Sequence, residues 1–254
     1  MMKKITSLSN PAIIEFSKLS NHKVRFLTGL FSVEGEKALN DILSSDIRIK
    51  NIFVTESYEN LDDLSKELVI AVSEPVMKKL ASSDSAPKVL TVAYQRDIAI
   101  EELLEKSRLL LLDGISDPGN LGTIIRSAVA FGIEGILFIN NCVDEYNAKV
   151  IRSAAGNFFK IPFFHIKNIT ELAQFTDFQF IMTDLHSDKV FTPDKIILSD
   201  KIILTLGSEA AGISQEVLSV THKNVKIDTI GVESLNVASA GTIIMYEFSK
   251  RKFK

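Results

Sequence analysis

Residues 109–138, LLLLDGISDPGNLGTIIRSAVAFGIEGILF, decide the fold of this chain. The stretch opens with an apolar run of strand length, and turn residues from Asp113 to Asn120 then predict a tight polar loop. Asn120 is placed to cap a helix that ends near Gly132, and residues 136–139 supply the next buried strand. The stretch therefore predicts one βαβ unit, whose loop lies where open α/β sheets bind their ligands.

One cationic side chain of the predicted helix faces this loop. Arg126 lies seven residues after Gly119 and four after Gly122, so the three share a helix face. Its side chain tilts toward the helix N-terminus and the loop. The two glycines leave space there for the guanidinium.

Two common nucleotide-binding motifs are excluded by the same loop. Gly114 and Gly119 have the spacing of the P-loop glycines, but Asn120 and Leu121 stand where Lys and Ser or Thr must follow. The dinucleotide fingerprint G-x-G-x-x-G is absent as well, which argues against a nicotinamide oxidoreductase. Taken alone, the loop is equally well explained by ordinary turn residues.

Two further polar loops adjoin buried elements later in the chain. Gly207-Ser208-Glu209 directly follows a predicted strand, and Ser234-Leu235-Asn236 directly precedes a predicted helix. Each alone is explained as a turn or a capping box. Three such loops in one domain predict a binding crevice.

These residues give the chain a resemblance to a known family, the SpoU-type (TrmH-like) RNA ribose 2′-O-methyltransferases of the knotted AdoMet-dependent superfamily. Asn120-x-Gly122, Arg126 and Phe131-Gly132 resemble its first motif. Residues 203–214, ILTLGSEAAGIS, resemble the second, and residues 231–241, GVESLNVASAG, resemble the third.

The third motif departs from the family pattern. The family usually has Ile-Pro-Met at its start, whereas this chain has Ile227-Asp228-Thr229 and is one residue shorter before Ser234. Loss of the proline removes a constraint on the loop backbone. This leaves open whether Ile227 or Ile230 contacts adenine.

The resemblance implies transfer of a methyl group from S-adenosyl-L-methionine (AdoMet) to a ribose 2′-hydroxyl of structured RNA. Ribosomal RNA is expected as the substrate in preference to transfer RNA. The resemblance further implies a homodimer. The lack of an apolar signal or membrane segment predicts a cytoplasmic protein, and the scattered histidines predict no metal. The residues expected in catalysis are Arg126, Asn120, Glu209, Ser234 and Asn236. Those expected to bind the cofactor are Leu206, Gly207, Ile227, Ile230 and Leu235.

The expected roles follow from the chemistry of the side chains. Because a guanidinium stays protonated in proteins, Arg126 is expected to pair with an RNA phosphate and the attacking 2′-oxygen, not to act as a base. Asn120, Ser234 and Asn236 would orient the ribose or the arginine. Glu209 would position the motif loops and face the cationic end of the cofactor.

The chain is expected to form two α/β domains. Strands alternate with helices in the first 95 residues, which predicts an α/β sandwich. The resemblance implies an L30e-like RNA substrate-binding domain over residues 1–95 and a knotted methyltransferase domain, with a parallel sheet and a deep trefoil knot, over 107–254. The charged residues 96–106 are expected to form a linker running into a short helix.

The elements expected in each domain are as follows. The first has helices from Asn10 to about Leu30 and over 36–43, 61–68 and 74–80, with strands over 49–55, 69–72 and 89–94. The second continues after the βαβ unit with a helix that Asp144 caps, running to about Ala154, and with strands over 180–183, 201–206 and 225–227. A helix capped by Ser214 runs to about Val220, residues 185–199 form a polar connection, and Asn236 starts the closing helix.

Composition limits the partners. At 254 residues and a formal net charge of -3, the chain has no global positive field, so RNA contacts must rest on local basic patches. Lys23, Arg25 and Arg152 are the expected RNA-binding residues. Solvation of a basic terminal segment explains Lys23 and Arg25 equally well, and a surface ion pair is the more common role for a helix arginine such as Arg152. The single Cys142 and four scattered histidines support neither an internal disulfide nor a metal centre. No apolar run approaches the length of a membrane span.

Two other functions are compatible with this fold. One is an RNA-binding scaffold that has lost catalysis, against which the retained set of polar motif residues argues. The other is a base methyltransferase of the related knotted group, which would need a general base near the cleft. No histidine or aspartate is placed by the sequence to serve as that base.

Overall fold

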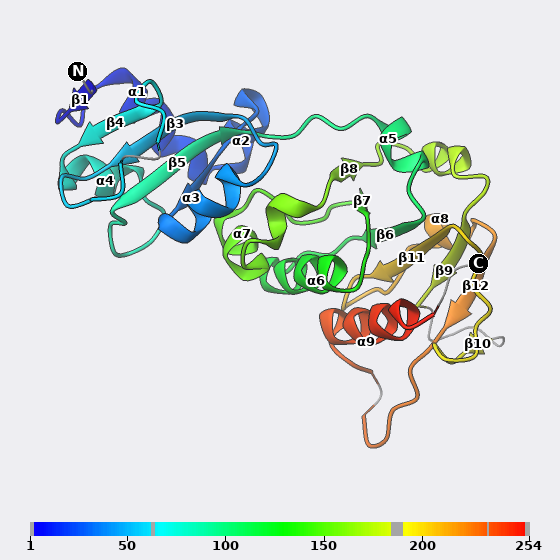
Figure 1. Cartoon of the computed structure of the whole chain (residues 1–254). Coiled ribbons are helices and arrows are strands. Elements are labelled where there is room, and N and C mark those ends of the chain that lie inside the picture. The colour runs from blue at the N-terminus through cyan, green and yellow to red at the C-terminus, as the bar shows by residue number, and fades with distance from the viewer. Residues whose placement is uncertain (1–2, 62–63, 184–189, 233, 252–254) are drawn as a thin grey trace. The chain divides into compact units, whose positions relative to one another are not determined.

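The computed structural model describes residues 3–61, 64–183, 190–232 and 234–251 (Figure 1). The chain divides into two compact units. Unit 1 consists of residues 1–96 and 146–152, and unit 2 consists of residues 97–145 and 153–254.

Unit 1 is built on a five-stranded mixed sheet in the order β1-β4-β3-β5-β2. The strands are β1 (Lys3–Ile5), β2 (Leu30–Glu34), β3 (Ile49–Val54), β4 (Val69–Val72) and β5 (Val89–Tyr94). The helices are α1 (Pro11–Phe16), the 3₁₀ helix η1 (Ser17–Ser20), α2 (His22–Thr28), α3 (Glu36–Leu43) and α4 (Glu74–Leu80). Side chains from α1, α4 and the sheet pack into one apolar core around Phe53 and Val92.

Most predicted elements of unit 1 are confirmed, and two are wrong. Asn10 caps α1 as expected, by accepting a hydrogen bond from Ala12 N at 3.0 Å. The predicted helix to Leu30 is nevertheless interrupted at Asn21, whose side chain accepts from Lys23 N and starts a new helix. The helix expected over 61–68 is absent from its described part, which forms turns, while residues 62–63 lie outside the described residues. Strand β2 was not predicted.

Unit 2 contains a parallel seven-stranded sheet in the order β10-β12-β9-β11-β6-β7-β8. Its strands are β6 (Arg108–Asp113), β7 (Gly135–Ile139), β8 (Phe163–His165), β9 (Gln179–Met182), β10 (Val190–Phe191), β11 (Ile202–Gly207) and β12 (His222–Val225). The other helices of the chain are α5 (Ile100–Leu104), α6 (Pro118–Ala130), α7 (Ala148–Ala154), η2 (Asn157–Lys160), η3 (Ile169–Gln174), α8 (Gln215–Leu218) and α9 (Val237–Ser249). Strands β6 and β11 are buried along almost their whole length, which explains their continuous apolar sequences.

The predicted βαβ unit is confirmed as β6-α6-β7, with Leu109 opposite Gly135 in the parallel pairing. The N-cap of its helix was predicted wrongly. Asp117 caps α6 by accepting from Asn120 N at 2.8 Å, and Pro118 takes the first helical position. Gly132 follows the helix with φ +77°, a left-handed conformation that glycine adopts without strain.

Three later boundaries also differ from the prediction. α7 starts at Ala148 and not at Asp144, because the side chain of Asn147 accepts from Lys149 N. Strand β12 covers residues 222–225, earlier than expected. Of the polar connection, residues 185–189 lie outside the described residues, and β10 occupies part of the remainder.

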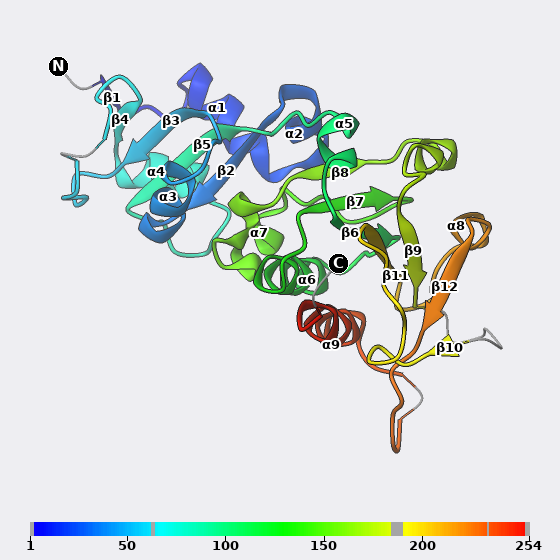
Figure 2. The same ribbon diagram turned by 45° about the vertical axis from the view of Figure 1, so that its right-hand side comes forward.

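The last helix, α9, lies beside α6 (Figures 1 and 2). The Ser127 and Thr242 hydroxyls are 2.7 Å apart, and the Phe131 and Tyr246 rings are 5.6 Å apart between centroids. A Cβ atom at Gly241 would lie 2.6 Å from Leu206 Cδ1, so glycine allows α9 to approach β11. The small residues early in α9 therefore place it against the strand that ends in the second motif.

An ion pair at the edge strand of unit 2 makes stability depend on pH. His165 Nε2 lies 3.1 Å from both carboxylate oxygens of Glu145, and its ring stacks on Phe138. Burial lowers the pKa of His165, but the hydrogen bond and charge of Glu145 outweigh it. The pKa therefore lies above its usual value of 6.5. A raised pKa stabilises the fold below the unfolded pKa, and that contribution is lost as pH rises through the folded pKa.

We expect His165→Gln to destabilise the protein more at about pH 5.5 than at about pH 8.5. Glutamine retains a donor for Glu145 but does not titrate. Urea unfolding of both proteins at each pH measures the effect. An equal difference in unfolding free energy at both pH values would contradict the pairing.

Candidate active site

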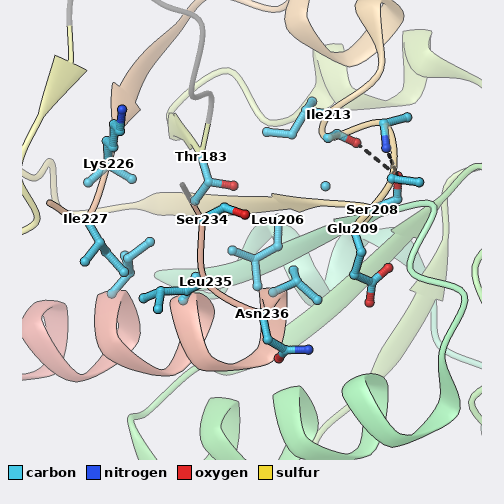
Figure 3. Close-up of a pocket in the computed structure, with 18 of the residues that line it drawn as sticks. Thr183, Leu206, Ser208, Glu209, Ile213, Lys226, Ile227, Ser234, Leu235 and Asn236 are labelled. Carbon is cyan, nitrogen blue, oxygen red and sulfur yellow. Dashed lines mark hydrogen bonds between the residues drawn. The ribbon is translucent and has the colours of Figure 1, made fainter. Parts of the chain in front are cut away.

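A pocket of about 630 Å³ lies at the carboxyl end of β11 in unit 2 (Figure 3). Strand β11 pairs with β6 as far as Gly207, but with β9 only as far as Thr205. Its last two residues therefore extend past β9 and form one wall. The other walls come from the segments that follow β9, β11 and β12 and from the start of α9; they include Thr183, Ser208, Glu209, Ile213, Ile227, Ser234, Leu235, Asn236, Ala240 and Ile244.

The loop after β11 folds back on itself and requires Gly207. Ser208 and Gly212 exchange two backbone hydrogen bonds of 3.0 and 2.9 Å, and Ser208 Oγ accepts from Ala211 N. A Cβ atom at Gly207 would lie 2.2 Å from the backbone carbon of Gly212. Only glycine fits this position, so the loop that lines the pocket depends on it.

A chain of hydrogen bonds joins the three motif segments at one side of the pocket. Asn120 Nδ2 donates to Glu209 Oε1, and Asn236 Nδ2 donates to Asn120 Oδ1 at 3.0 Å. Asn236 Oδ1 accepts from Ala238 N at 2.9 Å and Ser239 N at 3.3 Å, which caps α9. A carboxylate only accepts and helix N–H groups only donate, so both amides are fixed in orientation. We call this arrangement the Glu209–Asn120–Asn236 chain.

The corrected cap of α6 explains why Asn120 can join this chain. Asp117 accepts the hydrogen bond from the Asn120 backbone, so the Asn120 side chain is not used for capping. Its amide therefore connects loops that lie 89 and 116 residues further along the sequence.

We expect Asn120→Asp to lower the methyl transfer that the resemblance implies by about tenfold or more, about 1.4 kcal/mol in the barrier. The substitution removes the donor to Glu209 and places two carboxylates in contact. Steady-state rates with labelled AdoMet would measure the loss. Asn168→Asp is the matched control, because Asn168 caps η3 by accepting from Thr170 N, a task that aspartate also performs. Equal activity of both variants would contradict the role of Asn120.

Three residues predicted for the site lie outside the pocket lining: Asn120, Arg126 and Ile230. Arg126 is exposed on α6, and no hydrogen bond or ion pair joins its side chain to another part of the described chain. Ile230 is fully exposed, whereas Ile227 lines the pocket. Leu206, Gly207, Ser234 and Leu235 all line the pocket.

The residues predicted to bind RNA have different surroundings. Lys23 and Arg152 are exposed. Arg25 is only 4% exposed, and its Nη1 donates to the carbonyl oxygens of Leu19 and Ser20 at 2.7 and 2.9 Å. The prediction of an RNA contact for Arg25 is therefore corrected: its guanidinium fastens α2 to η1.

Sequence reasoning missed Asp113 and took it for a turn residue. It is the last residue of β6 and is only 3% exposed. Its carboxylate accepts from Ser214 N at 2.7 Å and from Asn140 Nδ2 at 2.5 Å. The bonds tie the second motif to the ends of β6 and β7. The sequence did contain a signal for this role, because Asp113 directly follows an apolar run. A carboxylate buried at the end of such a strand must accept hydrogen bonds from nearby donors.

Two kinds of feature are absent from the described ranges. No group of three or more His, Cys, Asp or Glu side chains there is arranged to hold a metal ion. No helix within the same ranges is long and apolar enough to cross a membrane.

The parallel sheet and its pocket define a ligand-binding α/β protein whose site lies beyond the carboxyl ends of its strands. The chain matches the model of the SpoU rRNA Methylase family over residues 107–246. It also matches the MRM3-like substrate binding domain over residues 10–91. The chain belongs to the SpoU rRNA methylase family.

Several relatives match nearly the whole chain. It is 29% identical to a 23S rRNA (guanosine(2553)-2′-O)-methyltransferase of Bacillus subtilis (strain 168), covering 96% of this chain and 98% of the relative. It is 26% identical to a 23S rRNA (uridine(2479)-2′-O)-methyltransferase of Streptomyces viridochromogenes, covering 92% and 87%. The crystal structure of an AdoMet-bound rRNA methyltransferase from Sinorhizobium meliloti superposes with a TM-score of 0.88, at 27% identity and 98% coverage of each chain.

Proposed function

We propose that this protein transfers the methyl group of AdoMet to a ribose 2′-hydroxyl of ribosomal RNA. The observation that carries the proposal is the Glu209–Asn120–Asn236 chain, which joins three distant segments beside one pocket. Family membership supports the reaction, and the relatives named 23S rRNA 2′-O-methyltransferases support the substrate.

The pocket residues suit AdoMet. The pocket volume of about 630 Å³ falls in the range of small-molecule sites, and the pocket is lined by both apolar side chains and loop backbone. Leu206, Ile227 and Leu235 would hold the adenine, and Gly207 would shape the backbone that receives the rest of the cofactor. Bound AdoMet supplies an electrophilic methyl group on a sulfonium. Ile230 is not part of this proposal, because its side chain is fully exposed.

Arg126 would act on the RNA side of the reaction. A guanidinium remains protonated, so its task is to stabilise negative charge on the attacking 2′-oxygen and the neighbouring phosphate. Its side chain is exposed, and helix side chains generally tilt toward the helix N-terminus, which in α6 carries Asn120. The Glu209–Asn120–Asn236 chain would hold the three motif loops in fixed positions, and Ser234 would orient the ribose. Alignment of the two reactants should supply much of the remaining acceleration.

The experiment that tests the function is methylation of RNA that lacks the modification. Purified protein is incubated with labelled AdoMet and total RNA from a strain without the gene, and alkali-resistant linkages are then mapped. We expect one such linkage in the large ribosomal RNA. A label on a base would overturn the ribose assignment. RNA binding without any label would favour the catalytically inactive scaffold.

We further propose the domain organisation and assembly that the resemblance implies. Residues 1–95 would form the L30e-like RNA-binding domain, 96–106 the linker, and 107–254 a domain with a deep trefoil knot. The match over residues 10–91 to a substrate binding domain supports the first assignment. The enzyme would act as a homodimer on cytoplasmic rRNA. Light scattering of the purified protein tests the dimer, and a monomeric mass would contradict it.

A further inference from the structure

An exposed aromatic and basic surface lies on helix α2 of unit 1. We define the α2 surface as His22, Lys23 and Phe26; Leu27 adjoins it. Phe26 is 76% exposed and Leu27 is 70% exposed, unusual values for large apolar side chains. Residues 16–33 contain no Asp or Glu, although Lys18, His22, Lys23 and Arg25 all lie among them. The surface therefore combines exposed apolar area with one exposed cation, Lys23, and no acidic residue of α2 lies beside it.

The helix is held from behind, so this face is presented in a fixed orientation. Arg25 is buried, and its guanidinium bonds the two carbonyl groups that precede the helix. Val24 packs against the core of unit 1. Gly29 ends the helix with φ +62°, and its N–H donates to Arg25 O at 2.9 Å. Both ends and the inner face of α2 are thus fixed, while the α2 surface faces solvent.

The spacing of the side chains suits one nucleotide. His22 and Phe26 are four residues apart, and their rings lie 6.5 Å apart between centroids, at 41°. Lys23 is three residues before Phe26 and thus a surface neighbour of its ring. Proteins bind unpaired bases by stacking them on aromatic rings, with cationic side chains on the phosphates. An exposed phenylalanine beside a lysine provides both contacts.

We propose that the α2 surface binds an unpaired nucleotide of the RNA substrate, with its base stacked on Phe26 and a phosphate at Lys23. The proposal rests on the proposed function, since it takes RNA as the substrate. The lack of Asp and Glu in residues 16–33 favours a polyanion over a protein partner. An apolar surface that docks a protein would not need to exclude acidic residues.

The test measures affinity of the full-length protein for a single-stranded RNA of about 12 nucleotides and for a duplex of the same length. We expect Phe26→Ala to weaken single-strand binding by about tenfold and duplex binding by less than about twofold. Phe26→Trp should retain single-strand affinity, because it keeps the ring. Leu27→Ala is the matched control, since Leu27 is equally exposed but offers no π face, and it should change affinity by less than about twofold.

A second readout reports stacking directly. A single-stranded RNA carrying one 2-aminopurine should lose fluorescence on binding, and Phe26→Ala should remove part of that loss. Lys23→Ala should reduce the salt dependence of binding, as expected when one phosphate contact is lost.

The proposal is overturned if Phe26→Ala changes single-strand affinity by less than about twofold, or if Leu27→Ala costs as much. Equal losses for single strand and duplex would also overturn it. Because Phe26 is exposed, unfolding temperatures of the variants should match the parent. Failure here with intact methylation of rRNA by the parent protein would refute the α2 surface alone. Absence of methylation by the parent would instead refute the proposed function.

Discussion

Arg126→Ala should lower methyl transfer by at least about a hundredfold and leave AdoMet affinity nearly unchanged. The guanidinium lies outside the pocket lining and has no hydrogen bond or ion pair within the described residues, so its removal leaves the cofactor walls intact. The variant would lose the positive charge that we propose stabilises the attacking oxygen. Rates with labelled AdoMet and isothermal titration of AdoMet measure the two quantities separately.

Two further variants sharpen the Arg126 result. Arg126→Lys keeps the charge but loses the planar fork of donors, so its rate should lie between those of the parent and the alanine variant. Lys167→Ala removes an exposed cation elsewhere in unit 2 and should have no effect. Turnover that survives the loss of Arg126 would show that another group stabilises the developing charge.

Gly207→Ala should abolish detectable AdoMet binding. The added methyl group would lie 2.2 Å from Gly212 C and 2.3 Å from Ile213 N, both of them backbone atoms. Backbone atoms cannot move aside as the end of a flexible side chain can. The loop would therefore lose the two backbone hydrogen bonds between Ser208 and Gly212. Titration of AdoMet against the purified variant measures the loss, with thermal unfolding to show that the sheet remains folded.

Gly212→Ala is the matched control for this effect. Gly212 has φ +68°, but a Cβ atom there would meet no atom within 4 Å. Its replacement should therefore cost only the strain of a left-handed residue, about 1–2 kcal/mol. Equal loss of AdoMet binding in both variants would show that loop strain, and not the clash behind Gly207, is responsible.

Much of the fold could be predicted because single segments carried their own signals. The apolar runs of β6 and β11 indicated strands buried on both faces, and Ser214 and Asn236 capped the helices expected of them. α3, α4, β4 and β5 have the predicted bounds. In these places local propensity and tertiary structure agree.

The errors arose where a side chain had two available partners. Asn120 and Asp117 could both cap α6, and periodicity could not show that Glu209 and Asn236 would engage Asn120. Arg25 lies in a basic segment, but its burial depends on where η1 places two carbonyl groups. Long-range contacts of this kind leave no trace in residue spacing.

The position of Asn236 also has a consequence for biosynthesis. Asn236 and the start of α9 supply one wall of the pocket, and Asn236 is the last member of the Glu209–Asn120–Asn236 chain. β6 and α6 are translated much earlier. A nascent polypeptide can thus assemble most of the sheet while its cofactor cleft is still open on one side. If AdoMet binds in this pocket as we propose, its capture would wait until the segment carrying α9 has left the ribosome, and AdoMet would be a ligand of the finished domain and not of its folding intermediates.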